Sequence, residues 1–202
     1  MESSKQKNHL KDPEYIVAFG VVLISVCALV VSIRQTNIMS EQRVLMHEQA
    51  KAAVWPRITL GVSKSHSQKD NSIVDYKINL SNAGVGPAII KYVKVSYDGN
   101  VATSWHNLFD YFNMPDSLPL YISNSNISQN IIRAGDVVRI LGFPDNLPLA
   151  QIFYEHSDKV EIEIYYESIY GDMWKYSTSP TGENTEALEL IPQFSNEEAF
   201  QN

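Results

Sequence analysis

An uncharged apolar stretch near the start of the sequence limits what the rest of the chain can fold into. It runs from Tyr15 to Ile33, YIVAFGVVLISVCALVVSI, and holds nineteen residues. At about 1.5 Å per residue, a helix of this length spans roughly the 30 Å hydrocarbon core of a bilayer. A signal peptide has a shorter apolar core and a small-residue cleavage site, whereas Ser32-Ile33-Arg34 is a poor site. We therefore predict a single uncleaved transmembrane helix at 15–33 with the lipid bilayer as its partner; the alternative is a removed signal.

The polar segment after the apolar stretch continues the helical pattern. Residues 34–54 contain no Gly or Pro and are rich in Gln, Glu, Met and Ala, which favour helix. Pro56 ends the pattern, because the residue before a proline is pushed out of the α region. We predict a stalk helix at 34–54, continuous with the anchor, and a disordered tail at 1–14. Lysines before the anchor and arginines after it are nearly equal in number, so the side of the soluble domain stays open.

Small and polar residues recur every seven positions along this helix. Two such series, offset by three residues, form one a/d seam that crosses the membrane boundary. The seam consists of Ala18, Val21, Ser25, Ala28, Ser32, Gln35, Met39, Gln42, Met46 and Gln49. Small residues let membrane helices approach closely, and serine can hydrogen-bond between them. The pattern predicts a parallel homo-oligomer formed through the helix, and the alternative is a lone anchor whose stalk packs on its own domain.

From Trp55 onward the apolar pattern becomes alternating. Residues 74–80 and 160–166, for example, alternate apolar with polar side chains, as half-buried strands do. Short strands separated by Gly, Asn and Asp turns predict an antiparallel β-sandwich at 55–181. Two insertions, at 104–113 and 144–157, are expected to form short helices, and residues 182–202 are expected to form an acidic C-terminal tail. The predicted fold class is mainly β with an N-terminal α part.

Composition argues against catalysis and against broad nucleic-acid binding. From Trp55 onward there are ten Lys and Arg against eighteen Asp and Glu, a balance of −8, so the basic surface of a nucleic-acid-binding domain is missing. The five histidines have no metal-ligand spacing, and the only cysteine, Cys27, lies in the anchor. The sequence contains no GxSxG, P-loop or GxGxxG motif. We predict no catalytic residue, metal or cofactor, and expect a protein or small-ligand partner at the loops of the β domain.

Two glycine motifs mark predicted turns. The first, NAGVGPA at 82–88, precedes a strand and not a helix, which favours a tight turn over a phosphate-binding loop. The second, at 170–172, joins two strands in a hairpin. The residues to which we assign a structural turn role are Asn82, Gly84, Gly86, Pro87, Tyr170, Gly171, Asp172 and Trp174.

The order of these features resembles a widespread group of uncharacterised bacterial single-pass membrane proteins. The resemblance is carried by the anchor, the VWP that closes the stalk, the GVGPA turn and the hairpin SIYGDMW at 168–174, which fits the pattern S-[VI]-Y-G-[DE]-x-W. Members often carry cysteines near the YG turn, where this chain has Tyr166 or Glu167 and Met173. The resemblance implies fold, topology and the bacterial inner membrane, but no activity.

These observations favour a membrane-anchored, non-enzymatic binding or sensing module that self-associates through its transmembrane and stalk helix. The alternative is a pore-forming membrane effector of a bacterial anti-phage defence operon, opened when the β domain binds a ligand or partner. That alternative depends on an analogy of layout and on the polar residues of the seam. Conductance separates the two hypotheses.

Overall fold

The computed structural model describes residues 13–70, 72–115, 118–144, 146–179, 182–194 and 199–201. The chain divides into two compact units, residues 1–50 and 51–202. Most of the predicted N-terminal tail lies outside the described residues, and so do the three lysines that bear on membrane orientation.

Helix α1 (Pro13–Ala53) is one unbroken helix of 41 residues. The predicted continuity of anchor and stalk is therefore confirmed, and the helix ends just before Pro56 as expected. Its apolar part is long enough to cross a membrane, and none of the side chains of α1 is buried within the described chain. The hydroxyl of Ser25 donates a hydrogen bond to the carbonyl of Val21, 2.8 Å away in the preceding turn.

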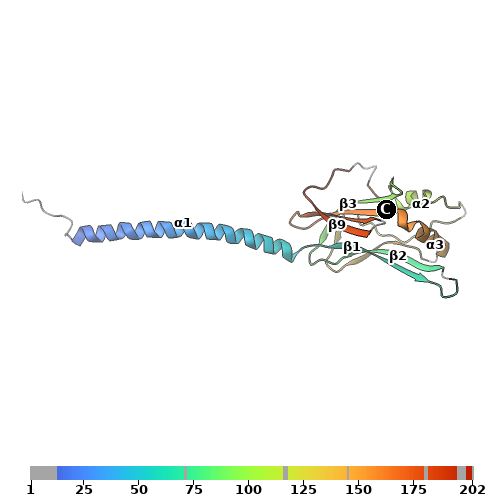
Figure 1. Ribbon diagram of the computed structural model, residues 1–202, viewed down its shortest axis with the longest axis horizontal. Helices are drawn as coiled ribbons and strands as arrows, with labels where there is room; N and C mark the ends of the chain where they lie inside the picture. Colours follow the sequence, from blue (N-terminus) through green and yellow to red (C-terminus); the bar gives the residue numbers. More distant parts are fainter. Residues whose placement is uncertain are drawn as a thin grey trace, which may run out of the picture. The chain divides into compact units, whose positions relative to one another are not determined.

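The C-terminal unit is a sandwich of two antiparallel sheets, which confirms the predicted fold class (Figure 1). The first sheet has the order β1-β2-β6, formed by β1 (Ile58–His66), β2 (Ile73–Asn82) and β6 (Val137–Gly142). The second has the order β4-β3-β7-β8-β9, formed by β4 (Asn100–Ala102), β3 (Ala88–Tyr97), β7 (Val160–Glu167), β8 (Met173–Ser179) and β9 (Gly182–Leu188), and β5 (Ile131–Ile132) also pairs with β3. The hairpin expected at 170–172 joins β7 to β8, and a second hairpin at 98–99 joins β3 to β4.

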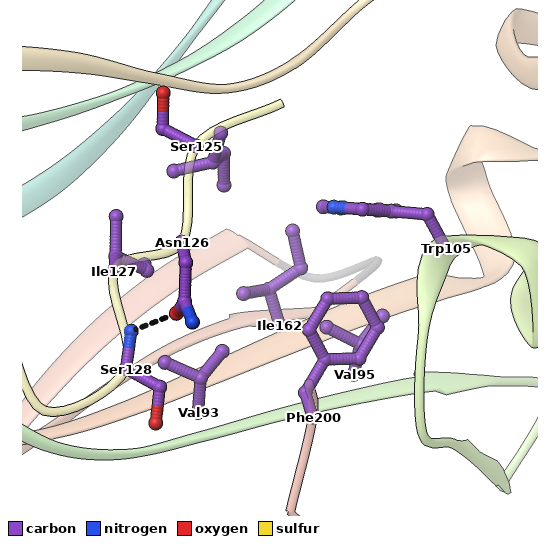
Figure 2. Close-up of a pocket in the computed structure, with 10 residues that line it drawn as sticks. Val93, Val95, Trp105, Ser125, Asn126, Ile127, Ser128, Ile162 and Phe200 are labelled. Carbon is purple, nitrogen blue, oxygen red and sulfur yellow. Dashed lines mark hydrogen bonds between the residues drawn. The ribbon is translucent and has the colours of Figure 1, made fainter. Parts of the chain in front are cut away.

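The region expected as an acidic tail begins with a strand and then contacts the domain. Residues 182–188 pair with β8 as the edge strand β9. Further on, the ring of Phe194 stacks on Tyr92 with 3.7 Å between centroids. Phe200 is buried, and its backbone N–H donates to the carbonyl of Val93 at 3.1 Å (Figure 2). The sandwich therefore extends beyond the expected boundary at residue 181. The sequence pattern did not predict β9, because its residues, GENTEAL, are exposed and show no alternation between apolar and polar side chains.

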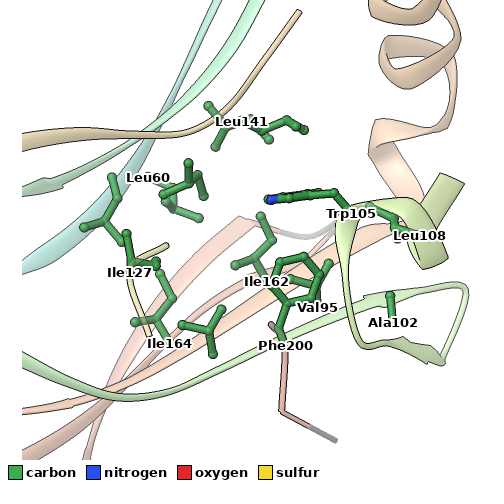
Figure 3. Packing of buried hydrophobic residues seen from close by; sticks show 14 of the residues in the cluster. Leu60, Val95, Ala102, Trp105, Leu108, Ile127, Leu141, Ile162, Ile164 and Phe200 are labelled. Atoms are coloured by element: carbon green, nitrogen blue, oxygen red, sulfur yellow. The ribbon is translucent and has the colours of Figure 1, made fainter. Parts of the chain in front are cut away.

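The inner faces of both sheets pack into one hydrophobic core. Figure 3 shows Leu60 and Leu141 of the first sheet facing Ile162 and Ile164 of the second. The two insertions form α2 (Trp105–Asp110) and α3 (Leu147–His156), and α3 continues into a short 3₁₀ helix, η2 (Ser157–Lys159). Their aromatic rings meet, with Phe109 and Phe153 6.0 Å apart between centroids. An opening between the two sheets, whose lining includes Leu60, Ile162 and Phe153, forms the cavity described below.

Candidate functional site

The NAGVGPA turn between β2 and β3 is built around the buried side chain of Asn82, which is 1% exposed. Its carbonyl oxygen accepts hydrogen bonds from the backbone N–H groups of Arg57 (3.1 Å) and Gly84 (3.0 Å). Its amide donates to the carbonyls of Gly86 (2.8 Å) and Ile132 (3.0 Å). A primary amide offers two acceptor sites and two donors, so the hydrogen-bonding capacity of Asn82 is fully used.

The two glycines of this turn are required by close packing. Neither has a positive φ. A Cβ added at Gly86 would overlap the backbone of Val54, and one added at Gly84 would overlap the backbone of Trp55 and Arg57. The N–H of Val85 also donates to the carbonyl of Trp55 at 2.9 Å. The turn therefore holds the segment 54–57, which connects the end of helix α1 to strand β1.

The hairpin between β7 and β8 reaches the same region. Gly171 has φ +81°, which only glycine adopts readily, and its N–H donates to the carbonyl of the buried Ser168 at 3.0 Å. The carboxylate of Asp172 lies 2.8 Å from the ammonium group of Lys51, in the last turn of α1. At the start of β8, Trp174 stacks on the ring of Tyr166. We call Lys51, residues 54–57, residues 82–87 and Asp172 the junction cluster.

Two tyrosine hydroxyls close the open edge of β1. The hydroxyl of Tyr176 accepts a hydrogen bond from the N–H of Leu60 at 3.1 Å, and that of Tyr166 bonds to the backbone of Ile58. Burial raises the pKa of both phenols, so both stay protonated at neutral pH. Because these tyrosines belong to the second sheet, they join the two sheets along an edge that would otherwise expose backbone donors.

A cavity of about 220 Å³ opens between the sheets beside the first half of β1, where Leu60 and Val62 line it. Its apolar lining includes Leu60 and Phe153, and its polar lining includes Tyr76 and the carboxylates of Asp158 and Glu183. Desolvation raises the pKa of Tyr76, which therefore stays a neutral hydrogen-bond donor. No lysine, arginine or histidine occurs among the described residues of the lining. Such a mixture suits a small ligand that has an apolar body and hydrogen-bond donors.

The structure places the sequence-predicted residues in two regions. The ten seam residues lie along α1, where the spacing puts them on one side of the helix. All eight turn residues lie in or beside the β2–β3 and β7–β8 turns, and Pro87 directly precedes β3. Of the two insertions, the one at 144–157 contributes to the cavity through Phe153 and Ser157. No group of three or more His, Cys, Asp or Glu side chains that could hold a metal ion occurs within the described ranges.

The sequence alone does not reveal the contact of the NAGVGPA turn with segment 54–57, the pairing of Lys51 with Asp172, or the cavity. The contacts and the cavity bring together residues that are distant in sequence. The pattern around Asn82 predicted a turn but not its bonds to Arg57 and Ile132. Comparison of the sequence with protein-family models gives no match, and comparison with curated proteins gives no significant match.

Proposed function

We propose that this protein is a membrane-anchored, non-enzymatic binding module that self-associates through α1 and binds a small ligand between its two sheets. The observation that supports self-association is the exposure of apolar side chains in the stalk part of α1. Ile38, Met39, Leu45 and Met46 are each more than half exposed, although they lie beyond the apolar anchor that lipid would cover. Apolar side chains on a single helix in water favour helix–helix association, and these four lie on or directly beside the predicted seam.

The junction cluster and β1 support a link between ligand binding and the helix. Leu60 and Val62 of β1 line the cavity, and β1 begins two residues after Pro56. The segment before β1 is bound by Asn82, and Lys51 is paired with Asp172. These contacts connect the cavity to residues 51–57 through β1.

Disulfide cross-linking in membranes tests self-association. In a Cys27→Ala background, single cysteines replace Ser32, Met39 or Met46 on the seam. Matched controls replace Asn37 or Val44, which the helical period places on the opposite face. We expect covalent oligomers from the seam positions and little cross-linking from the controls. A monomer at every seam position would contradict the proposal.

Thermal unfolding of the full chain in detergent, with a library of small polar and amphipathic compounds, tests ligand binding. Val62 lines the cavity and is 54% exposed, so Val62→Trp fills the cavity with little disturbance of the core. We expect some compounds to raise the melting temperature of the wild-type chain and not that of Val62→Trp, because a ligand stabilises only the folded state that binds it. Equal shifts in both chains would show that binding occurs elsewhere.

The pore-forming alternative predicts ion flux that is lost in Ser25→Leu. In α1 the Ser25 hydroxyl already donates to Val21 of its own helix, so it needs no partner from a second helix. No observation in the described residues specifically favours that alternative.

A further inference from the structure

Between its two short partners, one edge of β3 pairs with no other strand of the described residues. β5 pairs with β3 at Ala88–Ile89, and β4 pairs with it only from Val95 onward. The C-terminal segment occupies this stretch. The N–H of Phe200 donates to the carbonyl of Val93 at 3.1 Å, and the N–H of Gln201 donates to the carbonyl of Thr103 at 2.7 Å. Extended peptides bind to sheet edges through backbone hydrogen bonds of this kind.

The side chain of Phe200 enters an apolar socket behind this edge. It is only 5% exposed, and its ring meets Trp105 edge-on with 4.9 Å between centroids. Figure 2 shows the ring above Val93 and Val95 and beside Ile162. A single buried aromatic side chain surrounded by apolar contacts is the usual anchor in peptide recognition.

The socket retains a hydrogen-bond donor that the C-terminal segment does not satisfy. The indole Nε1 of Trp105 is buried and has no hydrogen-bond partner among the described residues. Figure 2 shows this end of the indole pointing into the space beside the Phe200 ring. That space is about 10 Å³, enough for one oxygen atom the size of a water molecule. Phe200 therefore fits the shape of the socket but offers no acceptor to this donor.

We propose that this socket is a peptide-binding site for a partner protein that presents an extended segment with an aromatic anchor, and that Ala199–Gln201 occupy it in cis. Tyrosine is the preferred anchor, because its phenolic oxygen can accept a hydrogen bond from Trp105 Nε1. The cis segment is tethered to the domain, which gives it a high local concentration but leaves the donor unpaired. A tyrosine-bearing partner segment makes one more hydrogen bond and so competes with it.

Fluorescence anisotropy with labelled peptides tests this proposal on the full chain in detergent. The receptor is the Phe200→Ala chain, whose socket is empty, and the wild-type chain is the control. The probes are a peptide of residues 190–202, the same peptide with Phe200→Tyr, and the same peptide with Phe200→Ala. We expect the first peptide to bind Phe200→Ala at least about tenfold more tightly than it binds the wild type, where the tethered segment competes.

The three peptides should also rank in a defined order. The Tyr peptide should bind about three- to tenfold more tightly than the Phe peptide, the size of one net hydrogen bond, and the Ala peptide at least about tenfold more weakly. In a Trp105→Phe receptor that also carries Phe200→Ala, the preference for tyrosine should disappear. A preference that remains there would overturn the assignment of the indole as the selecting group.

Other results would overturn the binding site itself. The first is equal affinity of the Phe peptide for the wild type and for Phe200→Ala. The second is binding of the Ala peptide as tight as that of the Phe peptide. The third is no binding of any peptide to a Phe200→Ala chain that keeps its β-sheet circular dichroism. If Phe200→Ala does not fold, Gln201→Pro is the second receptor, because it removes only the N–H that bonds to Thr103. It should bind the Tyr peptide more tightly than the wild type does, and equal affinity would contradict the proposal.

Discussion

Replacement of Asn82 by alanine gives the sharpest test of the junction cluster. The substitution removes four hydrogen bonds at once, two accepted by the side-chain carbonyl and two donated by the amide. Every partner is a backbone group, and each of these four groups loses its hydrogen bond when the Asn82 side chain is removed. We expect the domain to lose stability while its sheets and core remain in place.

The magnitude follows from the count of bonds. A net contribution of about 1 kcal/mol for each hydrogen bond gives a loss of about 4 kcal/mol in the free energy of unfolding. Domains of this size have a total stability of about 5–15 kcal/mol, so the loss is a large share of it. The corresponding fall in melting temperature is about 8–16 °C, at roughly 2–4 °C per kcal/mol.

Urea unfolding of the full chain in detergent, followed by circular dichroism, measures this loss. Asn79→Ala is the matched control, because Asn79 lies on the same strand, is half-buried and makes none of these four bonds. We expect the control to lose less than about 1 kcal/mol, as substitutions away from a buried network do. If Asn82→Ala were no more destabilising than Asn79→Ala, Asn82 would not be the centre of the junction cluster.

Three further predictions use the same unfolding assay. Gly86→Ala should lower the free energy of unfolding by about 2 kcal/mol or more, because its Cβ would overlap the backbone of Val54. The control Gly61→Ala should lower it by less than about 1 kcal/mol, because its Cβ would lie 3.9 Å from the nearest atom outside the adjacent residues. Equal losses for the two variants would contradict this prediction. A double-mutant cycle on Lys51 and Asp172 should give a coupling of about 0.2–1 kcal/mol, because both side chains are about one-third exposed, and zero coupling would remove the pair from the cluster. Burial raises the pKa of Tyr176 above the ordinary 10.0, so its contribution to stability should be constant below about pH 10 and fall above it, where the unfolded chain loses the phenolic proton first. Because burial also raises the pKa of Tyr76 and Tyr166, Tyr176→Phe should make the fall smaller without abolishing it.

Local patterns in the sequence were sufficient for most of the fold. The end of α1 follows from Pro56, and β2 and β7 follow from alternation between apolar and polar residues. The hairpin turns follow from glycines such as Gly99 and Gly171, which both have positive φ. Each of these signals depends on residues that are neighbours in the chain, and such signals can be read without a structure.

The candidate site was much less predictable, because its parts meet only after folding. Asn82 is bonded to Arg57 and Ile132, which lie in segments far from it in sequence. The phenol of Tyr176 looks like an ordinary alternating strand residue until the edge of β1 lies beside it. Phe200 is a lone aromatic residue in a polar segment, so no periodicity marks it as part of the core.

Because the side chain of Asn82 bonds only to backbone groups, the side chains around it can change in sequence without loss of its hydrogen bonds. The four groups that Asn82 binds are present whatever side chains stand at residues 57, 84, 86 and 132, although the backbone contacts of Gly84 and Gly86 still demand glycine there. Arg57, and the neighbouring Trp55 with a side chain 49% exposed, are therefore free to change without loss of the attachment. Selection can alter the side chains of residues 55 and 57 while the backbone of segment 54–57 stays bound to the turn.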